Sequence, residues 1–395
     1  MNSWINATIG AVAEVVSGGT PDTKRQEYWG GGIQWITPSE IEAIRDYITE
    51  PTCKNITEAG LKGSSAVLIP EGSIILCSRA TIGECAINTY PITTNQGFKN
   101  LVPNGHILTK FLYYWVLTQK KALLRISAGS TFLEFSGHDL KKLPIVLPPL
   151  EEQRRIIAVL EVWDKAIELL DKKIELKDQV KKGLVQQLLS GKKRLPGFFG
   201  AWKTEQLGKV GWLSKDIVDP RLAPNEMYLE YSMPAFDNNQ TPDRVVGSTM
   251  KSIRLLVPEY VLLFNKLNVR KKRIWLVLGE SGAVCSTEFL LYCSDQANLV
   301  FLKALLSTAR VTFDFVGMSS GTSNSQKRIT ANDLLSYHVS LPPLSEQQAI
   351  AAVLEAADAE LNALRKKREL IAAQRKFLLN NLVTGKLRVP ENVGV

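Results

Sequence analysis

Two long stretches of the chain carry apolar residues at alternating spacings of four and three. In the first stretch the positions are Ile156, Leu160, Trp163, Ile167, Leu170 and Ile174. In the second they are Ile350, Leu354, Ala357, Leu361 and Leu364, and Arg368 stands where the first stretch has Ile174. This spacing is typical of an α-helix that packs against another helix along one seam. The pattern predicts two long helices that pair through Ile156 to Leu170 and Ile350 to Leu364.

Both helices have clear start and stop signals. Pro-Pro precedes each stretch, an acidic first turn follows it, and Gly191 and Gly385 are natural stops. A helix from residue 151 to 189 would be about 58 Å long at 1.5 Å per residue. After the seam the apolar pattern shifts phase, to Leu176, Leu184 and Leu188 and to Leu370, Leu378 and Leu382. In an alternative interpretation each helix packs only on its own globular neighbour. Pairing is favoured because both helices carry the same otherwise unburied stripe.

The two helices belong to an internal repeat. The run from Leu147 to Gln153 recurs from Leu341 to Gln347, at an offset of 194 residues that holds for about fifty residues. The repeat divides the chain into a globular segment (1–146), a helical region (147–198), a second globular segment (199–340) and a second helical region (341–395). We expect an α+β protein with two mixed α/β domains, separated by two long helices that pack as an antiparallel coiled coil. A pseudo-twofold axis would relate the two halves.

The globular segments have short β-like runs broken by Gly and Pro. Strands are predicted at residues 66–69 and 73–76 in the first segment, and at 260–264 and 274–278 in the second. Helices are predicted near residues 108–124 and 298–308. The two segments also show weak sequence similarity to each other, such as a Gly-Ser/Thr loop shortly before each Leu-Pro-Pro-Leu run.

Composition limits the class of protein. The 395 residues are 45% hydrophobic and 22% charged, which is typical of a globular protein. No apolar run is long enough to cross a membrane, and the N-terminus does not resemble a secretion signal. The five scattered Cys fit reduced thiols, so we expect a cytoplasmic protein. The net charge of +9 permits a polyanionic partner, although residues 1–150 contribute only +1 and the helical segments 151–194 and 345–388 contribute +3 each.

Signatures of catalysis are missing. The sequence has no phosphate-binding loop, because Gly191-Lys192 and Gly385-Lys386 lack both the upstream Gly and the following Ser or Thr. Neither Pro-Pro pair belongs to the Asn/Asp-Pro-Pro-Tyr/Phe motif of adenine methyltransferases. The three His and five Cys have no metal-ligand spacing, and Cys77, Cys85, Cys285 and Cys293 are expected to be small buried apolar residues. We therefore expect a non-enzymatic chain with no metal.

The order of motifs resembles the specificity subunit of type I restriction–modification systems. The resemblance covers essentially the whole chain and is most specific in the doubled Pro-Leu-x-Glu-Gln helix starts at residues 149–153 and 343–347. Gly18-Gly19-Thr20-Pro21 and residues 35–39 match marks of the family's first target-recognition domain. The second globular segment lacks the Gly-Gly-Thr-Pro mark and has Asp219-Pro220 in that region.

The resemblance implies a function for each part. Each globular segment would be a target-recognition domain that reads one half of a bipartite double-stranded DNA site. The helices would set the spacing and dock two methylation subunits, and restriction subunits that translocate DNA could join. The chain itself would have no cofactor, since S-adenosylmethionine, ATP and Mg would bind only to partner subunits.

Base readout needs donors and acceptors on loops or helix ends. The candidates in the first segment are Lys24, Arg25, Thr37, Ser39, Arg79, Lys99, Ser130 and Thr131. The candidates in the second segment are Lys215, Asn265, Lys266, Arg270, Lys271, Lys272, Arg273, Ser323, Lys327 and Arg328. The run from Arg270 to Arg273 is the densest basic cluster, and it is either a phosphate clamp or a solvated turn. Two alternatives remain for the whole chain: a coiled-coil assembly scaffold without DNA specificity, and the same recognition subunit in a methylation-only system.

Overall fold

The computed structural model describes residues 4–41, 44, 46–128, 133–278, 282–321 and 326–391. They form two compact units: unit 1 contains Met1–Lys172 and Lys366–Val395, and unit 2 contains Lys173–Arg365. Each unit holds one globular head and part of both long helices. The ends of both long helices are built into the cores of the heads.

The head of unit 1 is a mixed α/β domain. Its strands are β1 (Ile5–Thr8), β2 (Ala13–Ser17), β3 (Trp29–Ile36), β4 (Tyr47–Ile48), β5 (Lys54–Ile56), β6 (Ile74–Leu76), β7 (Cys85–Asn88), β8 (Thr93–Thr94), β9 (Lys99–Pro103) and β10 (Pro144–Leu147). Its helices are α1 (Ile9–Val12), α2 (Pro38–Ile41), α3 (Glu58–Lys62), α4 (Thr109–Thr118), α5 (Lys120–Ile126) and α6 (Gly137–Lys142), with a 3₁₀ turn at Gln26–Tyr28.

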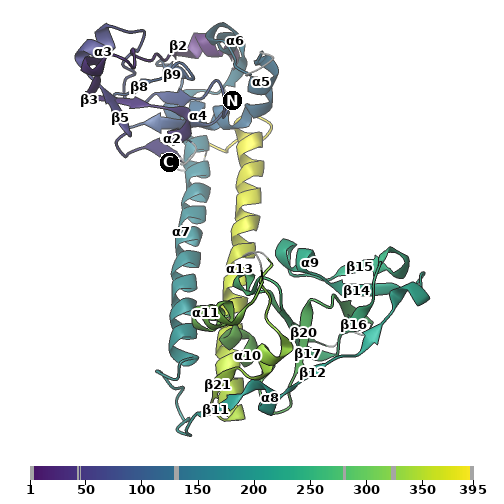
Figure 1. The fold of residues 1–395 in the computed structure, drawn as a ribbon. Coiled ribbons are helices and arrows are strands. Elements are labelled where there is room, and N and C mark those ends of the chain that lie inside the picture. The colour runs from purple at the N-terminus through teal and green to yellow at the C-terminus, as the bar shows by residue number, and fades with distance from the viewer. Residues whose placement is uncertain are drawn as a thin grey trace. The chain divides into compact units, whose positions relative to one another are not determined.

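Two sheets and a small ribbon organise this head (Figure 1). A five-stranded sheet has the order β2-β9-β6-β7-β4, a three-stranded sheet has the order β5-β3-β8, and β1 pairs with β10. The predicted strand at 73–76 is confirmed as β6, whereas residues 66–69 contribute only an isolated bridge between Ile69 and Ile92. The predicted helix at 108–124 is interrupted at Gln119, between α4 and α5.

The head of unit 2 has the same general plan. Its strands are β11 (Lys203–Gln206), β12 (Trp212–Ser214), β13 (Ile217–Val218), β14 (Met227–Tyr231), β15 (Asp243–Val246), β16 (Arg254–Leu256), β17 (Tyr260–Asn265), β18 (Ile274–Leu278), β19 (Ala283–Cys285), β20 (Phe289–Cys293) and β21 (His338–Leu341). Its helices are α8 (Leu207–Val210), α9 (Met233–Asn238), α10 (Leu299–Leu306), α11 (Ala309–Met318) and α12 (Ala331–Leu335), with 3₁₀ turns at Pro220–Leu222, Gly247–Thr249 and Val269–Lys271.

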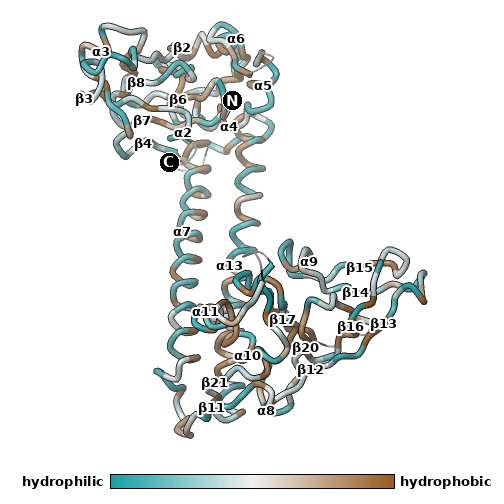
Figure 2. Tube along the Cα trace, viewed as in Figure 1, coloured by the Kyte–Doolittle hydropathy of each residue, from teal (hydrophilic) through white to brown (hydrophobic). Residues whose placement is uncertain are grey.

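A four-stranded sheet, β12-β20-β17-β18, and a five-stranded sheet, β13-β16-β19-β14-β15, form this head, and β11 pairs with β21. Strands β17 and β20 are among its most hydrophobic segments (Figure 2), and Leu262, Leu263 and Leu291 on them are buried. The predicted strands at 260–264 and 274–278 and the predicted helix at 298–308 are confirmed as β17, β18 and α10.

The two long helices have nearly the predicted bounds. They are α7 (Leu150–Leu188) and α13 (Leu344–Leu382), each with 39 residues. Each ends before a glycine in the left-handed conformation, Gly191 at φ 68° and Gly385 at φ 73°. That conformation is strained for residues with a Cβ atom, so glycine ends the helix at little cost.

Ion pairs between α7 and α13 define an antiparallel arrangement within each unit. In unit 1, Arg375 Nε lies 2.8 Å from Asp164 Oδ1 and Arg368 Nε lies 2.9 Å from Asp171 Oδ1. In unit 2, Lys177 Nζ lies 2.8 Å from Glu360 Oε1, and Lys181 pairs with Asp358. Arg368, which replaces an apolar residue of the repeat, thus serves as an ion-pair partner.

Burial along the seam supports helix pairing for some positions and packing on the globular heads for others. Among the predicted pairing positions, Ile156, Leu160, Ile350, Leu354 and Leu361 are buried, and Trp163, Ile167, Leu170, Ala357 and Leu364 are half-buried.

The buried positions at the helix starts belong to the cores of the heads. Ile156 and Leu160 join the core of head 1 together with Leu379 and Leu382 from the end of α13. Ile350 and Leu354 join the core of head 2 together with Leu188 from the end of α7. The predicted continuation of the seam through Leu176 and Leu370 is wrong, because both side chains are exposed. The phase shift rotates them away from the partner helix.

The glutamine of each Pro-Leu-x-Glu-Gln motif fastens a helix start to its head. Gln153 Oε1 accepts from Leu108 N at 2.8 Å, at the start of α4, and Gln153 Nε2 donates to Pro148 O at 2.9 Å. Gln347 makes the same pair of contacts, with Asn298 N at 2.9 Å and Pro342 O at 2.9 Å. Both glutamines are buried, so losing either amide would leave unpaired polar groups in the core.

The glutamate of the motif binds an arginine that follows the other helix. Glu152 receives two hydrogen bonds from Arg388, at 2.5 and 2.6 Å, and one from Trp4 Nε1 at 3.0 Å. Glu346 likewise receives two hydrogen bonds from Arg194. We call these two groups the Glu–Arg locks. Burial opposes ionisation of Glu152, but the hydrogen bonds from Arg388 and Trp4 hold its pKa below the ordinary value.

The lock of unit 1 yields a stability prediction. Replacing Arg388 by Ala leaves the buried Glu152 carboxylate without its partner, so we expect unit 1 to lose about 2–4 kcal/mol of unfolding free energy at neutral pH. Chemical denaturation followed by tryptophan fluorescence measures this loss. Lys386→Ala, which removes an exposed cation close by, is the matched control and should change little.

The pH dependence of this loss is a second readout. Because the folded-state pKa of Glu152 is lowered, the lock stabilises above the ordinary carboxylate pKa and its contribution fades as pH falls through the lowered value. The difference between wild type and Arg388→Ala should therefore shrink in acid. A difference that stays constant from neutral pH into that range would contradict the ionic lock.

Candidate nucleic-acid interface

Head 2 brings two basic segments together that are far apart in the sequence. Asn268 N donates to Lys327 O at 2.9 Å and Ile329 N donates to Lys266 O at 3.2 Å, so residues 266–268 lie beside residues 327–329, and the 3₁₀ turn Val269–Lys271 follows directly. Lys271 and Lys272 are exposed, and Lys266 and Lys327 are half-buried. None of these four lysines has an acidic ion-pair partner among the described residues. We call this group the basic surface of head 2.

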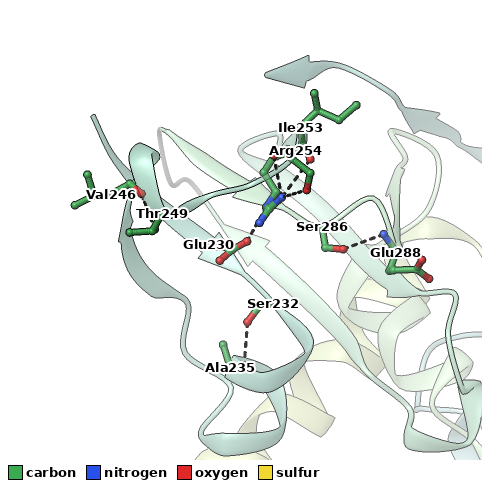
Figure 3. Close-up of polar contacts among 10 residues, drawn as sticks. Glu230, Ser232, Ala235, Val246, Thr249, Ile253, Arg254, Ser286 and Glu288 are labelled. Carbon is green, nitrogen blue, oxygen red and sulfur yellow. Dashed lines mark hydrogen bonds and ion pairs between the residues drawn. The ribbon is translucent and has the colours of Figure 1, made fainter. Parts of the chain in front are cut away.

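Other cations of head 2 are already neutralised. Arg273 binds both carboxylate oxygens of Asp237, at 2.8 and 2.5 Å, and Arg328 Nε lies 3.1 Å from Glu288. Figure 3 shows Arg254 on β16 directed at Glu230 of β14, at 2.7 Å. These arginines have lower capacity for a phosphate than the unpaired lysines. Arg273 is therefore a weaker phosphate-clamp candidate than its sequence neighbours.

Head 1 repeats a pair of isolated bridges of head 2 with opposite charge at the shared position. Isolated bridges join Glu134 to Arg79 and to Ala128, just as bridges in head 2 join Arg328 to Leu267 and to Ser320. Glu134 pairs with Lys99 at 3.2 Å. The position that carries an arginine in head 2 thus carries a glutamate in head 1. The two heads present different chemistry at the same place in the fold.

The structure sorts the candidate residues by exposure. Exposed candidates are Lys24, Arg25, Ser39, Lys215, Arg270, Lys271, Lys272 and Arg328; half-buried ones are Thr37, Arg79, Lys266, Arg273 and Lys327; buried ones are Lys99 and Asn265. Ser130, Thr131 and Ser323 lie outside the described residues.

Three candidates bond other groups of the protein. Asn265 is 3% exposed and donates to Glu288 O, so it cannot reach a groove without leaving the core. Lys99 is buried against Glu134. Thr37 Oγ1 bonds Glu40 at 2.8 Å, and Glu40 in turn accepts from Thr37 N, which holds the start of α2. These polar side chains satisfy the protein's own backbone and carboxylates, which spacing along the sequence cannot show.

Sequence reasoning missed a cleft in head 1. It has a volume of about 500 Å³ and is lined by Thr23, Trp29, Gly30, Trp35, Cys53, Lys54 and Asn55. Trp29 and Trp35 pack edge to face, with ring centroids 5.0 Å apart. Gly19 O accepts from Trp35 Nε1 at 3.0 Å, which ties the cleft to the Gly-Gly-Thr-Pro segment. The nearby run from Trp35 to Ser39 was the available signal, but its cleft-forming partners lie on another strand.

The described residues contain no cluster of three or more His, Cys, Asp or Glu side chains that could hold a metal ion. Within the same residues, no helix is long and apolar enough to cross a membrane.

Comparison with known proteins identifies the family. The profile of the type I restriction modification DNA specificity domain matches residues 1–178 and 249–372. The chain belongs to this family of type I specificity subunits.

Named relatives agree with this assignment. The MjaIX specificity subunit of Methanocaldococcus jannaschii is 41% identical over 179 residues, which cover 45% of this chain and 41% of that protein. The EcoR124I/EcoR124II specificity subunit of Escherichia coli is 31% identical over 44% of this chain and 45% of its own length. The chain thus spans less than half the length of these two relatives. The MjaVIII specificity subunit of M. jannaschii is 23% identical over 98% of this chain and 93% of its own length.

Solved structures share the fold. One chain from a structural study of the assembly of the type I restriction–modification system has a TM-score of 0.64 at 19% identity and covers 98% of this chain and 99% of its own. The S subunit from M. genitalium has a TM-score of 0.56 at 13% identity, with 96% of each chain covered. The expected fold class is confirmed: mixed α/β heads and an antiparallel pair of long helices.

The cleft yields a prediction about thiol chemistry. Cys53 is exposed, whereas Cys77, Cys85, Cys285 and Cys293 are buried, as expected for the latter four. Burial raises the pKa of Cys77 to about 11 and that of Cys285 to about 12, so these thiols rarely form the reactive thiolate. N-Ethylmaleimide should label the folded chain once, at Cys53, as mass spectrometry of tryptic peptides will show. Cys53→Ser should abolish this fast labelling. Equal labelling of Cys77 or Cys285 in the folded chain would contradict the structure.

Proposed function

We propose that this chain is the DNA-recognition subunit of a type I restriction–modification system. Each head reads one half of a bipartite site, and α7 and α13 set the distance between the halves. The observation that carries the proposal is the basic surface of head 2, where Lys266 and Lys327 lie on adjacent segments, Lys271 and Lys272 follow on the next turn, and none of the four forms an ion pair among the described residues. Such a group of free cations suits phosphates, which supply affinity but no sequence information.

Sequence discrimination has to come from differences between the heads. The loop position with Glu134 in head 1 and Arg328 in head 2 is one such difference. Two heads of one plan but different surface chemistry suit a site with two different halves. This supports recognition over a scaffold role, which requires no difference in polar surface between the heads.

The helices also offer surfaces for protein partners. In unit 1, the register of the ion pairs places Val162 of α7 at the level of Phe377 of α13, and Leu169 at the level of Leu370, and all four side chains are exposed. In unit 2, Leu176 and Val180 of α7 are exposed. Exposed apolar side chains on paired helices suit further helices of a partner protein. We assign these faces to two methylation subunits.

Chemistry is assigned to the partners. S-adenosylmethionine would bind the methylation subunits, and ATP and Mg would bind a restriction subunit where one joins. A methylation-only system would use this chain in the same way.

An electrophoretic shift assay tests the proposal. The probe is the chain assembled with its methylation subunits, titrated with duplexes that carry or lack the split site found by methylome sequencing. Lys271→Gln combined with Lys327→Gln should weaken binding to both kinds of duplex, and the slope of log K against log salt should fall by about 0.9 for each lost contact. Lys209→Gln, at an exposed lysine of α8 in the same head, is the control and should keep the wild-type slope.

The assay also separates the alternatives. Equal binding to split-site and scrambled duplexes would favour the assembly scaffold. An unchanged salt slope in the double variant would remove the basic surface from the interface.

A further inference from the structure

The cleft of head 1 has rigid aromatic walls. Trp29 Nε1 donates to Asp22 O at 3.2 Å and Trp35 Nε1 donates to Gly19 O at 3.0 Å, so both indole rings are held in place. The proposed function assigns no role to this cleft, and none of Trp29, Cys53, Lys54 and Asn55 was a candidate from the sequence. Its lining combines aromatic surface, one amide and one lysine.

A threonine organises two amide side chains on β3 and β5, of which Asn55 also lines the cleft. Thr52 N donates to Gln34 Oε1 at 2.7 Å, and Thr52 Oγ1 lies 2.8 Å from the same oxygen. Because a backbone N–H can only donate, Gln34 must present its oxygen to Thr52 and turn its NH₂ group away. Asn55 lies directly opposite Gln34 in the β3–β5 register, and its Oδ1 is 3.3 Å from Thr52 Oγ1.

The free ends of this cluster are hydrogen-bond donors. Neither Gln34 Nε2 nor Asn55 Nδ2 has a hydrogen-bond partner among the described residues. The segment that carries Asn55 is held by further bonds, since Cys53 N donates to Glu40 at 2.9 Å and Thr52 Oγ1 is 2.7 Å from Lys54 O. Gln34, whose oxygen is bound by Thr52 N, and Asn55, which lies opposite it on β5, form a pair of amides with donors available on fixed strands. The geometry suits a ligand edge that offers acceptor atoms.

Cations lie on the segments that line the cleft. Lys54 is exposed and has no ion-pair partner within the described part of the chain. Lys24 and Arg25 follow Thr23, which lines the cleft, and both are exposed. Arg25 also contacts the hydroxyl of Tyr28 at 2.8 Å. An anionic ligand that presents acceptors at its centre and phosphates at its flanks matches this distribution.

We infer that the Gln34–Thr52–Asn55 cluster reads a base-pair edge in the half-site of head 1, with Lys54 on a neighbouring phosphate. The donor pair selects for acceptor atoms, of which guanine offers two adjacent ones, N7 and O6, in the major groove. Thr52 is a positioning residue, because it contacts the amides and not the DNA. This inference rests on the proposed function and assigns one recognised position to named side chains.

The labelling rate of the Cys53 thiol reports whether DNA covers this part of head 1, and the experiment needs no substitution. The chain assembled with its methylation subunits is treated with N-ethylmaleimide alone, with the split-site duplex, and with a scrambled duplex. Protection of Cys53 by the split-site duplex, and weaker protection by the scrambled one, supports the inference. Labelling of Cys53 at one rate in all three samples overturns it.

Variants test the readout itself. Asn55→Leu and Gln34→Leu are compared with wild type on duplex libraries randomised at each position of the split site. We expect discrimination to fall by about 5- to 100-fold at one or two adjacent positions of the head 1 half-site. The half-site of head 2 should be read as before. Asn55→Asp, which replaces a donor by an acceptor, should shift the preference at the same position towards a base that offers an amino group. Lys121→Leu, at an exposed lysine of α5, is the control.

The outcomes distinguish this inference from the proposed function. Uniform weakening on every duplex, or unchanged discrimination at every position, overturns the assignment of the reader while the split-site preference of wild type still stands. A wild-type assembly that shows no split-site preference overturns the proposed function itself. Circular dichroism of each variant establishes that altered discrimination occurs in a folded chain.

Discussion

A buried carboxylate at the start of each long helix, bound by an arginine that follows the other helix, is the constraint on which the architecture depends. Glu152 and Arg388 join three distant parts of the sequence in unit 1, because Trp4 also donates to the carboxylate. Glu346 and Arg194 join two distant parts in unit 2, where Trp202 Nε1 is buried and has no partner among the described residues. A charge buried in this way is costly unless it is paired, so each lock requires the antiparallel arrangement of α7 and α13.

Some parts of the fold could be predicted from the sequence and others could not. The helix bounds and the repeat follow from proline, glycine and apolar spacing, which act locally. The fate of Leu176 and Leu370 could not be predicted in this way. Where the apolar pattern of a helix shifts phase, a side chain lies either against the paired helix or in solvent. The position of the paired helix determines which of the two occurs. Similarly, Ile156 and Ile350 have the spacing of coiled-coil residues but are buried in the cores of the heads.

For the candidate interface, the sequence predicted only clusters of charged residues that are continuous along the chain. The run from Arg270 to Arg273 is visible in the sequence, but the backbone bonds that join the preceding residues 266–268 to the distant residues 327–329 are not. Whether a cation is paired also depends on the fold, because Arg273 binds Asp237 whereas Lys271 forms no ion pair among the described residues. The Gln34–Thr52–Asn55 cluster was invisible because it depends on strand register. Amides on different strands become neighbours only after β3 and β5 pair.

The central claim is that the two heads read two separate half-sites. Methylome sequencing of a host that expresses this chain with its methylation subunits, beside a second strain in which residues 199–340 are exchanged for the corresponding head of a relative, tests it most directly. The account predicts adenine methylation in a motif of two short specific parts separated by a constant number of unspecified bases, and the exchange should alter one part only. A continuous motif, methylation without sequence preference, or an exchange that alters both parts would contradict the account.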